Sequence, residues 1–189
     1  MTACPLSEVS DEAELVHAAQ TGDRAAFGQL YDRYARMVHG ILLARVPRRE
    51  VDDLVQDVFL LAMRRLPSLR DAARIGAWLA TIARNRCSDF YRRSRTAHDL
   101  AGDSIDAGAG NQATASGQEL SAERVLAIIR TLPEAYRETL ILRLVEGMTG
   151  PEIAARTGLS PGSVRVNLHR GMGQLRDKLG HASLGCGKP

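Results

Sequence analysis

Residues 97–118 divide the chain. They read AHDLAGDSIDAGAGNQATASGQ, a stretch rich in Gly, Ala, Ser and Asp with scarcely any large apolar side chain. Such a segment cannot bury enough apolar surface to offset the entropy lost on ordering. We therefore expect a flexible linker between two small modules, residues 11–96 and residues 119–180. Residues 1–10 are expected to be a disordered N-terminus, and residues 181–189 a frayed C-terminal tail.

Both modules are expected to be helical, because only 4% of the 189 residues are aromatic while Ala, Leu and Arg are abundant. Apolar residues recur at spacings of three and four, as in amphipathic helices. In the first module this pattern predicts helices over residues 11–20, from Phe27 to before Pro47, over residues 49–66 with Pro67 as the stop, and over residues 75–95. In the second it predicts helices over residues 121–132 with Ser121 as the N-cap, from Pro133 to Gly147 with Leu140, Ile141, Leu144 and Val145 as the inward residues, from Thr149 to Gly158 and onward from Pro161. The all-α fold thus consists of two small helical domains joined by a flexible linker.

The strongest local signal is a helix-turn-helix near the C-terminus. Thr149 followed by Glu152 is a capping box, and Gly158 should end the helix that it opens. Ser160 is then a second N-cap, with Pro161 at the first helical position. This order of helix, tight turn and helix is typical of DNA-binding modules.

The second helix of this motif has an inward and an outward face. The inward residues are predicted to be Val164, Leu168, Met172, Leu175 and Leu179. The outward candidates for DNA contact are Ser163, Arg165, Val166, His169 and Arg170, with Asn167 at the margin. Arg can pair with guanine and Asn with adenine in the major groove. The alternative is that these charged residues only solvate a surface helix.

A basic surface is predicted on the last helix of the first module. Its candidate residues are Arg74, Arg84, Asn85, Ser88, Arg92 and Arg93, and Asp89 is the only acidic residue from Arg74 to Arg95. Such a face attracts a phosphate backbone, although a charge run is more often a solvated face. Trp78 lies on the apolar stripe of the same helix, so we expect it in the core rather than stacked on a base.

The third helix has an acidic face. Asp53, Gln56 and Asp57 lie side by side at offsets of three and four residues. Carboxylates repel DNA, so a protein partner with basic groups fits this face better, with a solvated surface as the default.

Several classes of function are disfavoured. The three cysteines, Cys4, Cys87 and Cys186, lie far apart without zinc-ligand spacing, so neither a metal site nor a disulfide is expected, and a redox role for them stays open. No cofactor motif, nucleophile elbow or phosphate loop occurs, so we name no catalytic residue and expect no enzyme. No apolar run is long enough to span a bilayer and no signal peptide is visible, so we expect a cytoplasmic protein.

Three segments resemble regions 2 and 4 of extracytoplasmic-function (ECF) sigma factors of bacterial RNA polymerase. They are DLVQDVFLLAMRRL, WLATIARNRCSDFYRR and LPEAYRETLILRLVEGMTGPEIAARTGLSPGSVRVNLHRGMGQLRDKL. The resemblance implies that Asp53, Gln56 and Asp57 bind the clamp helices of the largest subunit of core polymerase. It implies that the loop from about Ser68 to Arg74 and the helix through Arg84 and Asn85 bind and melt the −10 promoter element. It also implies that the helix around Arg165 to Arg170 recognises the −35 element.

The resemblance also implies an anti-sigma factor that occludes both modules. Val166, Asn167, Gly171, Met172 and Gly173 depart from the residues usual at their positions in the family. The −35 preference is therefore not transferable, and the two glycines should weaken the helix. Two other functions remain open: a helix-turn-helix regulator that acts without polymerase, and a sigma-like decoy that only sequesters an anti-sigma factor.

Overall fold

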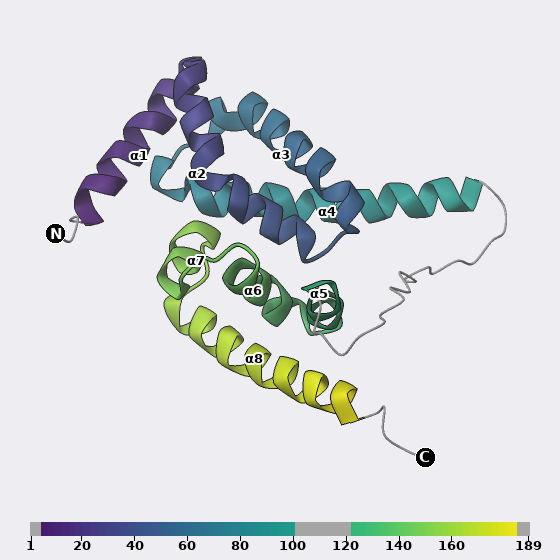
Figure 1. The fold of residues 1–189 in the computed structure, drawn as a ribbon. Helices are drawn as coiled ribbons and strands as arrows, with labels where there is room; N and C mark the ends of the chain where they lie inside the picture. The colour runs from purple at the N-terminus through teal and green to yellow at the C-terminus, as the bar shows by residue number, and fades with distance from the viewer. Residues whose placement is uncertain (1–4, 101–121, 185–189) are drawn as a thin grey trace.

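The computed structural model describes residues 5–100 and 122–184, and every regular element in these two ranges is helical. The first module contains α1 (Pro5–Gln20), α2 (Arg24–Leu43), α3 (Val51–Arg65) and α4 (Ile75–Leu100). Short 3₁₀ turns at Arg48–Glu50, Leu66–Ser68 and Ala72–Arg74 connect its last three helices. The second module contains α5 (Ala122–Arg130), α6 (Glu134–Leu144), α7 (Gly150–Thr157) and α8 (Pro161–Leu184) (Figure 1). The predicted all-helical architecture is confirmed.

Local chemistry explains where the helices of the first module begin and end. Asp23 caps α2, and its carboxylate accepts hydrogen bonds from the amides of Ala25 at 2.8 Å and Ala26 at 3.1 Å. Pro47 and Pro67 follow α2 and α3, as predicted, because proline cannot donate the amide hydrogen bond that would continue the helix. Trp78 packs against the core, which confirms its predicted structural role.

Two helices of the first module are longer than their patterns predicted. α1 begins at Pro5, inside the segment expected to be disordered, and α4 continues to Leu100, four residues into the expected linker. Residues 101–118 of that linker, and the expected N-cap Ser121, lie outside the described residues. Helical patterns locate a buried face well, but they say little about solvent-exposed turns beyond it.

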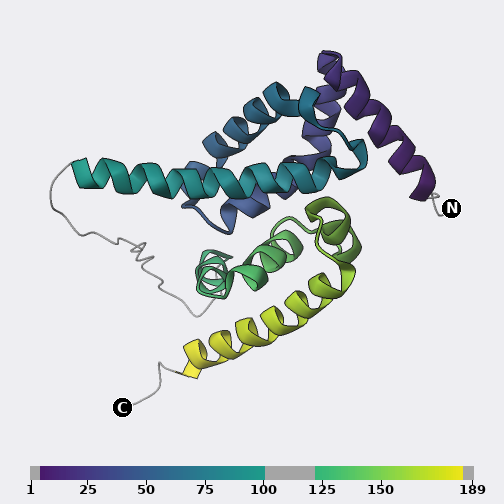
Figure 2. The same cartoon turned by 180° about the vertical axis from the view of Figure 1, so that it is seen from behind.

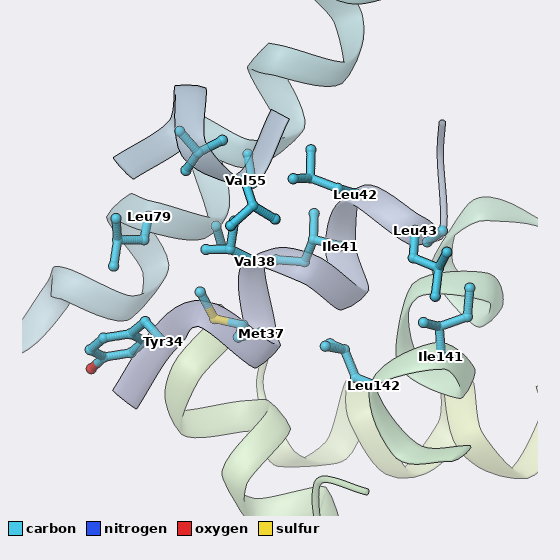
Figure 3. Close-up of a cluster of buried hydrophobic side chains, with 14 of the residues drawn as sticks. Tyr34, Met37, Val38, Ile41, Leu42, Leu43, Val55, Leu79, Ile141 and Leu142 are labelled. Atoms are coloured by element: carbon cyan, nitrogen blue, oxygen red, sulfur yellow. The ribbon is translucent and has the colours of Figure 1, made fainter. Parts of the chain in front are cut away.

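The modules pack directly against each other rather than standing apart. α6 lies between α8 on one side and α2 on the other, and α7 lies against the first turns of α4 (Figures 1 and 2). The side chains of Leu140, Ile141 and Leu142 are all fully buried, and Ile141 lies beside Leu43 at the end of α2 (Figure 3). One continuous hydrophobic core therefore joins both modules.

This packing corrects one part of the prediction for α6. Leu144 and Val145 were expected to point inward, but they are 46% and 48% exposed, while Leu142 is buried instead. Leu142 lies against Gly40 of α2, where an added Cβ atom would sit 2.7 Å from its Cδ2 atom. Because α6 is buried on two sides, its buried residues do not follow a single apolar stripe. The stripe therefore predicted the wrong inward residues at the end of this helix.

Candidate nucleic-acid interface

Both predicted caps of the helix-turn-helix are formed. The Thr149 amide donates to Glu152 Oε2 at 2.7 Å, and the Glu152 amide donates to Thr149 Oγ1 at 3.4 Å, which completes the capping box. The hydrogen bond from the Thr149 amide holds the pKa of Glu152 below its ordinary value. Gly158 ends α7 at φ +75°, and the Ser160 hydroxyl accepts from the Ser163 amide at 3.1 Å at the start of α8. These caps fix the angle at which α8 leaves the turn.

The outer face of α8 carries the candidate DNA-binding side chains. Ser163, Arg165, Val166, His169 and Arg170 are exposed, and Asn167 is half-buried. Within the described part of the chain, neither Arg165 nor Arg170 forms an ion pair. Val164 and Leu175, on the opposite face, are buried. The predicted division of α8 into two faces is therefore present, and its guanidinium groups are available to a ligand.

One residue of α8 differs from the prediction, and Gly171 has a packing role besides its predicted effect on helix stability. Met172 is 37% exposed rather than buried. Gly171 is buried, and an added Cβ atom would lie 3.1 Å from Leu140 Cδ1 and from Tyr136 Cβ. Glycine at 171 thus allows α8 to lie close against α6, which is a packing role that a helix-propensity argument misses.

The predicted basic surface lies on α4 and the turn before it. Asn85, Ser88, Arg92 and Arg93 are exposed, and Arg74 is exposed in the preceding 3₁₀ turn. Asp89, their acidic neighbour, accepts a hydrogen bond from Arg92 at 2.9 Å. Arg84 differs from the other residues of this surface, because its guanidinium binds a carboxylate of the second module.

The acidic face of α3 is also present. Asp53 and Gln56 are exposed, while Asp57 is half-buried and lines an open groove of about 390 Å³ between α3 and α4, together with Arg86 and Asp89. Leu60 and Met63 extend the exposed side of α3 with apolar surface, at 50% and 48% exposure. Mixed acidic and apolar surfaces of this kind suit a protein partner better than DNA.

Comparison with known proteins identifies the two modules. Residues 30–97 match the family model of Sigma-70 region 2, and residues 122–175 match Sigma-70, region 4. The ECF RNA polymerase sigma-E factor of Haemophilus influenzae is 31% identical over 183 residues, which cover 91% of this chain and 96% of that protein. This chain belongs to the ECF family of RNA polymerase sigma factors. The predicted resemblance is confirmed, as is the expectation that the protein is not an enzyme.

Another relative and two solved structures are also similar to this chain. The ECF sigma factor BldN of Streptomyces coelicolor is 32% identical over 167 residues, which cover 86% of this chain but 63% of BldN. The solved structure of CnrH in complex with the cytosolic domain of CnrY superposes with a TM-score of 0.60 at 30% identity, covering 90% of this sigma factor and 97% of CnrH. CnrH is a sigma factor of Cupriavidus metallidurans. The structure of RpoE with the anti-sigma factor NepR from Bartonella quintana, at 24% identity and a TM-score of 0.55, shares the fold.

The contact that sequence reasoning missed in this sigma factor joins Arg84 to Glu138. Arg84 donates to Glu138 Oε1 at 2.7 Å through Nη2 and to Oε2 at 3.3 Å through Nε, while Arg45 Nη2 lies 2.6 Å from Oε2. Only 5% of the Glu138 side chain is exposed. Burial by itself raises the pKa of Glu138, but the hydrogen bond from Arg84 and the charges of Arg45 and Arg84 outweigh it and lower the pKa.

Of the three cysteines, the structure describes only Cys87. Cys87 is a free thiol in the core, and burial raises its pKa to about 11, so it is a poor nucleophile. Cys4 and Cys186 lie outside the described residues. Among the residues that the structure describes, no cluster of His, Cys, Asp and Glu could hold a metal ion, and no helix is long and apolar enough to cross a membrane.

Proposed function

We propose that this sigma factor binds core RNA polymerase through the acidic face of α3, binds and opens the −10 element with α4, and recognises the −35 element with α8. The residues assigned to polymerase are Asp53, Gln56 and Asp57. Those assigned to the −10 element are Arg74, Arg84, Asn85, Ser88, Arg92 and Arg93. Those assigned to the −35 element are Ser163, Arg165, Val166, Asn167, His169 and Arg170.

The observation that carries the proposal is the outer face of α8. A capped helix-turn-helix presents Arg165 and Arg170 to solvent, and both guanidinium groups are free of ion pairs within the described residues. Arginine in this setting can donate two hydrogen bonds to guanine or hold phosphates on either side of the groove. The motif favours DNA binding over an ordinary solvated helix, because the second helix of a helix-turn-helix is the one that enters the major groove.

The acidic face of α3 supports the polymerase assignment. Carboxylates repel DNA, so an acidic face on a DNA-binding chain fits a protein partner with basic groups better. Leu60 and Met63 beside these carboxylates supply apolar area that an interface would bury. A regulator acting without polymerase would not need this face.

The opening of DNA by α4 needs no external source of energy. Capture of flipped bases in protein pockets offsets the few kcal/mol of stacking and pairing lost per base. Arg92 and Arg93 are exposed on α4 and can hold the backbone of the separated strand. Because RNA polymerase and the chromosome share the cytoplasm of a bacterium, we place the protein there.

An anti-sigma factor is the expected regulatory partner. CnrH was solved with the cytosolic domain of CnrY, and this sigma factor shares the fold of CnrH over most of its length. We propose that a protein of this class binds across both modules of this sigma factor and blocks its polymerase and DNA surfaces.

Runoff transcription tests the proposed function. The purified chain is added to bacterial core polymerase on a library of genomic fragments, and transcripts are mapped. We expect transcripts from a small set of fragments that share two spaced elements. A regulator without polymerase docking would form no stoichiometric complex with core enzyme, and a decoy would form that complex without producing specific transcripts.

A further inference from the structure

One side chain of α1 holds the segment that joins α3 to α4. We call this segment, residues 66–74, the α3–α4 loop, and it lies beside α1 (Figures 1 and 2). Gln20, the last residue of α1, donates through Nε2 to the carbonyl oxygens of Leu66 at 3.1 Å and Leu69 at 2.8 Å. An amide nitrogen carries two N–H groups, so this single side chain binds both carbonyls at once.

The two carbonyls lie on either side of a turn in the α3–α4 loop. The Leu69 amide donates to the Leu66 carbonyl at 3.0 Å, which closes a short 3₁₀ turn. At Leu69 the backbone then becomes extended, with φ −73° and ψ 114°. A short 3₁₀ turn has poor hydrogen-bond geometry and opens easily when nothing else supports it. Because Gln20 binds the carbonyl at each end of the turn, it fixes the direction in which the chain continues to Arg70.

Gln20 is itself held on a helix that packs against the core. Its Oε1 atom lies 3.2 Å from Nδ1 of His17, one turn earlier in α1. Val16 of α1 is fully buried, and Glu12 pairs with Arg33 of α2 at 3.3 Å. The amide of Gln20 therefore has a fixed support, and little further entropy is lost when it binds the loop.

The second half of the α3–α4 loop carries groups that suit DNA. The Asp71 carboxylate accepts from the Ala73 amide at 3.1 Å and lies 3.3 Å from Nε of Arg74, which we assign to the −10 element. The Arg74 side chain is 79% exposed. Among the described residues, the amides of Arg70 and Asp71 have no hydrogen-bond acceptor. Backbone amides and guanidinium groups are common donors to the phosphates of DNA.

We propose that Gln20 is a positioning residue for recognition of the −10 element. It holds the α3–α4 loop in the shape that presents Arg74 and the amides of Arg70 and Asp71 to the separated DNA strand. This inference rests on the proposed role of α4 and the turn before it in binding that element. Gln20 acts through the loop and contacts no DNA itself. A hydrogen bond that only stabilised the fold would leave the opening of DNA unchanged.

Two substitutions remove the N–H groups of Gln20 in different ways. Gln20→Met keeps the approximate length of the side chain without a charge, and Gln20→Glu keeps its shape but adds a carboxylate. Gln29→Glu, an exposed position on α2, adds the same charge away from the loop. Arg33→Ala removes the ion pairs of α2 with Asp11 and Glu12 and leaves both hydrogen bonds of Gln20 in place. These controls separate the loss of the donors from added charge and from a loosened α1.

The first test measures amide hydrogen exchange in the free full chain by NMR. The amides of Leu69 and Arg74, which form the turns of the loop, should exchange at least about fivefold faster in Gln20→Met and Gln20→Glu than in the parent, as the loss of an ordinary hydrogen bond allows. The amide of Leu79, in the buried part of α4, should not change, and Gln29→Glu should behave like the parent. Unchanged exchange in the loop would overturn the inference, whatever the chain does in transcription.

The second test measures promoter opening by the chain bound to core polymerase. The promoter found by runoff transcription carries 2-aminopurine in its −10 element, and its fluorescence reports the open fraction. Gln20→Met and Gln20→Glu should lower the equilibrium constant for opening about tenfold, as expected for one or two hydrogen bonds of ordinary strength. Binding to a duplex that contains only the −35 element should stay the same.

Two further comparisons decide whether the effect comes from the loop. Arg33→Ala should unfold at a lower denaturant concentration than the parent, yet open the promoter equally well. The same loss of opening in Arg33→Ala would assign the effect to the attachment of α1 and overturn the inference. Arg74→Ala should reduce opening in the parent and add little in Gln20→Met, because the two residues act through one loop. Fully additive losses would show that Gln20 does not position Arg74.

Failure of this inference can be distinguished from failure of the proposed function. If Gln20→Met loosens the loop but opens the promoter like the parent, the positioning role is refuted and the proposed function stands. If the parent chain itself opens no promoter with core polymerase, the proposed function is wrong and the inference fails with it.

Discussion

The Nδ1 atom of His39 on α2 lies 2.7 Å from Oε1 of Glu146, in the turn that follows α6. This pair joins the two modules at a titratable group. The hydrogen bond to Glu146 raises the pKa of His39, burial opposes the increase, and the charges of Glu146 and Asp52 add to it while that of Arg48 opposes it. Arg36 is also close, since it binds the Glu146 carbonyl.

Module contact should therefore weaken as the solution becomes alkaline. A His whose pKa is raised where the modules are in contact contributes fully below its ordinary pKa of about 6.5, and the contribution is lost as pH rises through the raised value. Spin labels at Arg64→Cys and Asp177→Cys, one exposed position in each module, with Cys4 and Cys186 replaced by Ser, report the distance between the modules by double electron–electron resonance. The distribution of this distance should broaden through this pH window. His39→Gln should remove the dependence, whereas His17→Gln, an exposed position on α1, should keep it. A His39→Gln profile identical to that of the parent would contradict this prediction.

The acidic face of α3 gives a prediction about polymerase. Asp53→Arg with Asp57→Arg should reduce affinity for core polymerase at least about a hundredfold, because reversal of two charges turns attraction into repulsion. Affinity is measured by fluorescence anisotropy of the labelled chain, with circular dichroism as a check of folding. Glu14→Arg with Asp32→Arg makes the same change in charge at exposed positions of α1 and α2 and should bind like the parent. Unchanged affinity in the α3 variant would show that core polymerase binds to another surface of the chain.

The capping box gives a prediction about stability. Thr149→Ala removes the hydroxyl that accepts from the Glu152 amide, and it should lower the free energy of unfolding by about 1 kcal/mol. Chemical denaturation followed by circular dichroism measures the change. Thr131→Ala, at an exposed hydroxyl outside the motif, is the matched control and should cost less. An equal loss in both variants would show that the box adds no stability beyond that of an ordinary surface hydroxyl.

Sequence patterns predicted the helices and the outward face of α8 because both depend on local signals. Pro47, Pro67, Gly158 and the capping box act within one turn of their own positions. The exposed face of α8 follows from the spacing of Val164 and Leu175, which are buried.

The contact between modules did not follow from these patterns, because its partners lie far apart in the chain. Arg84 looks like a solvated cation until its partner Glu138, 54 residues away, is known. One signal was present: Leu140, Ile141 and Leu142 are consecutive large apolar residues, and a helix that is apolar on several sides is buried on several sides. The direction of burial, against α2, still required the three-dimensional arrangement.

Arg165 and Arg170 should differ from Arg176, the third arginine of α8. Arg165→Ala and Arg170→Ala should each weaken binding to the promoter duplex by about 1 to 3 kcal/mol if they contact bases. Arg176→Ala, exposed two turns further along α8, should have a smaller effect. Binding is measured by anisotropy on the promoter found by runoff transcription and on a scrambled duplex. A uniform loss on both duplexes would assign these arginines to phosphates rather than bases.

Val166 should recognise a thymine methyl group. It is an apolar side chain, 44% exposed, on a face whose neighbours Arg165, His169 and Arg170 are polar, and in the major groove the apolar feature of a base pair is the 5-methyl group of thymine. Replacing thymines of the −35 element by uracil, one at a time, removes only that methyl group. At one position the parent chain should lose roughly fourfold in affinity, as expected for about 0.8 kcal/mol per buried methyl-sized group. Val166→Ser should bind both duplexes equally at that position, and Val166→Thr, which keeps one methyl group, should retain part of the preference. Loss of affinity at the same position in Val166→Ser and in the parent would assign the methyl contact to another residue.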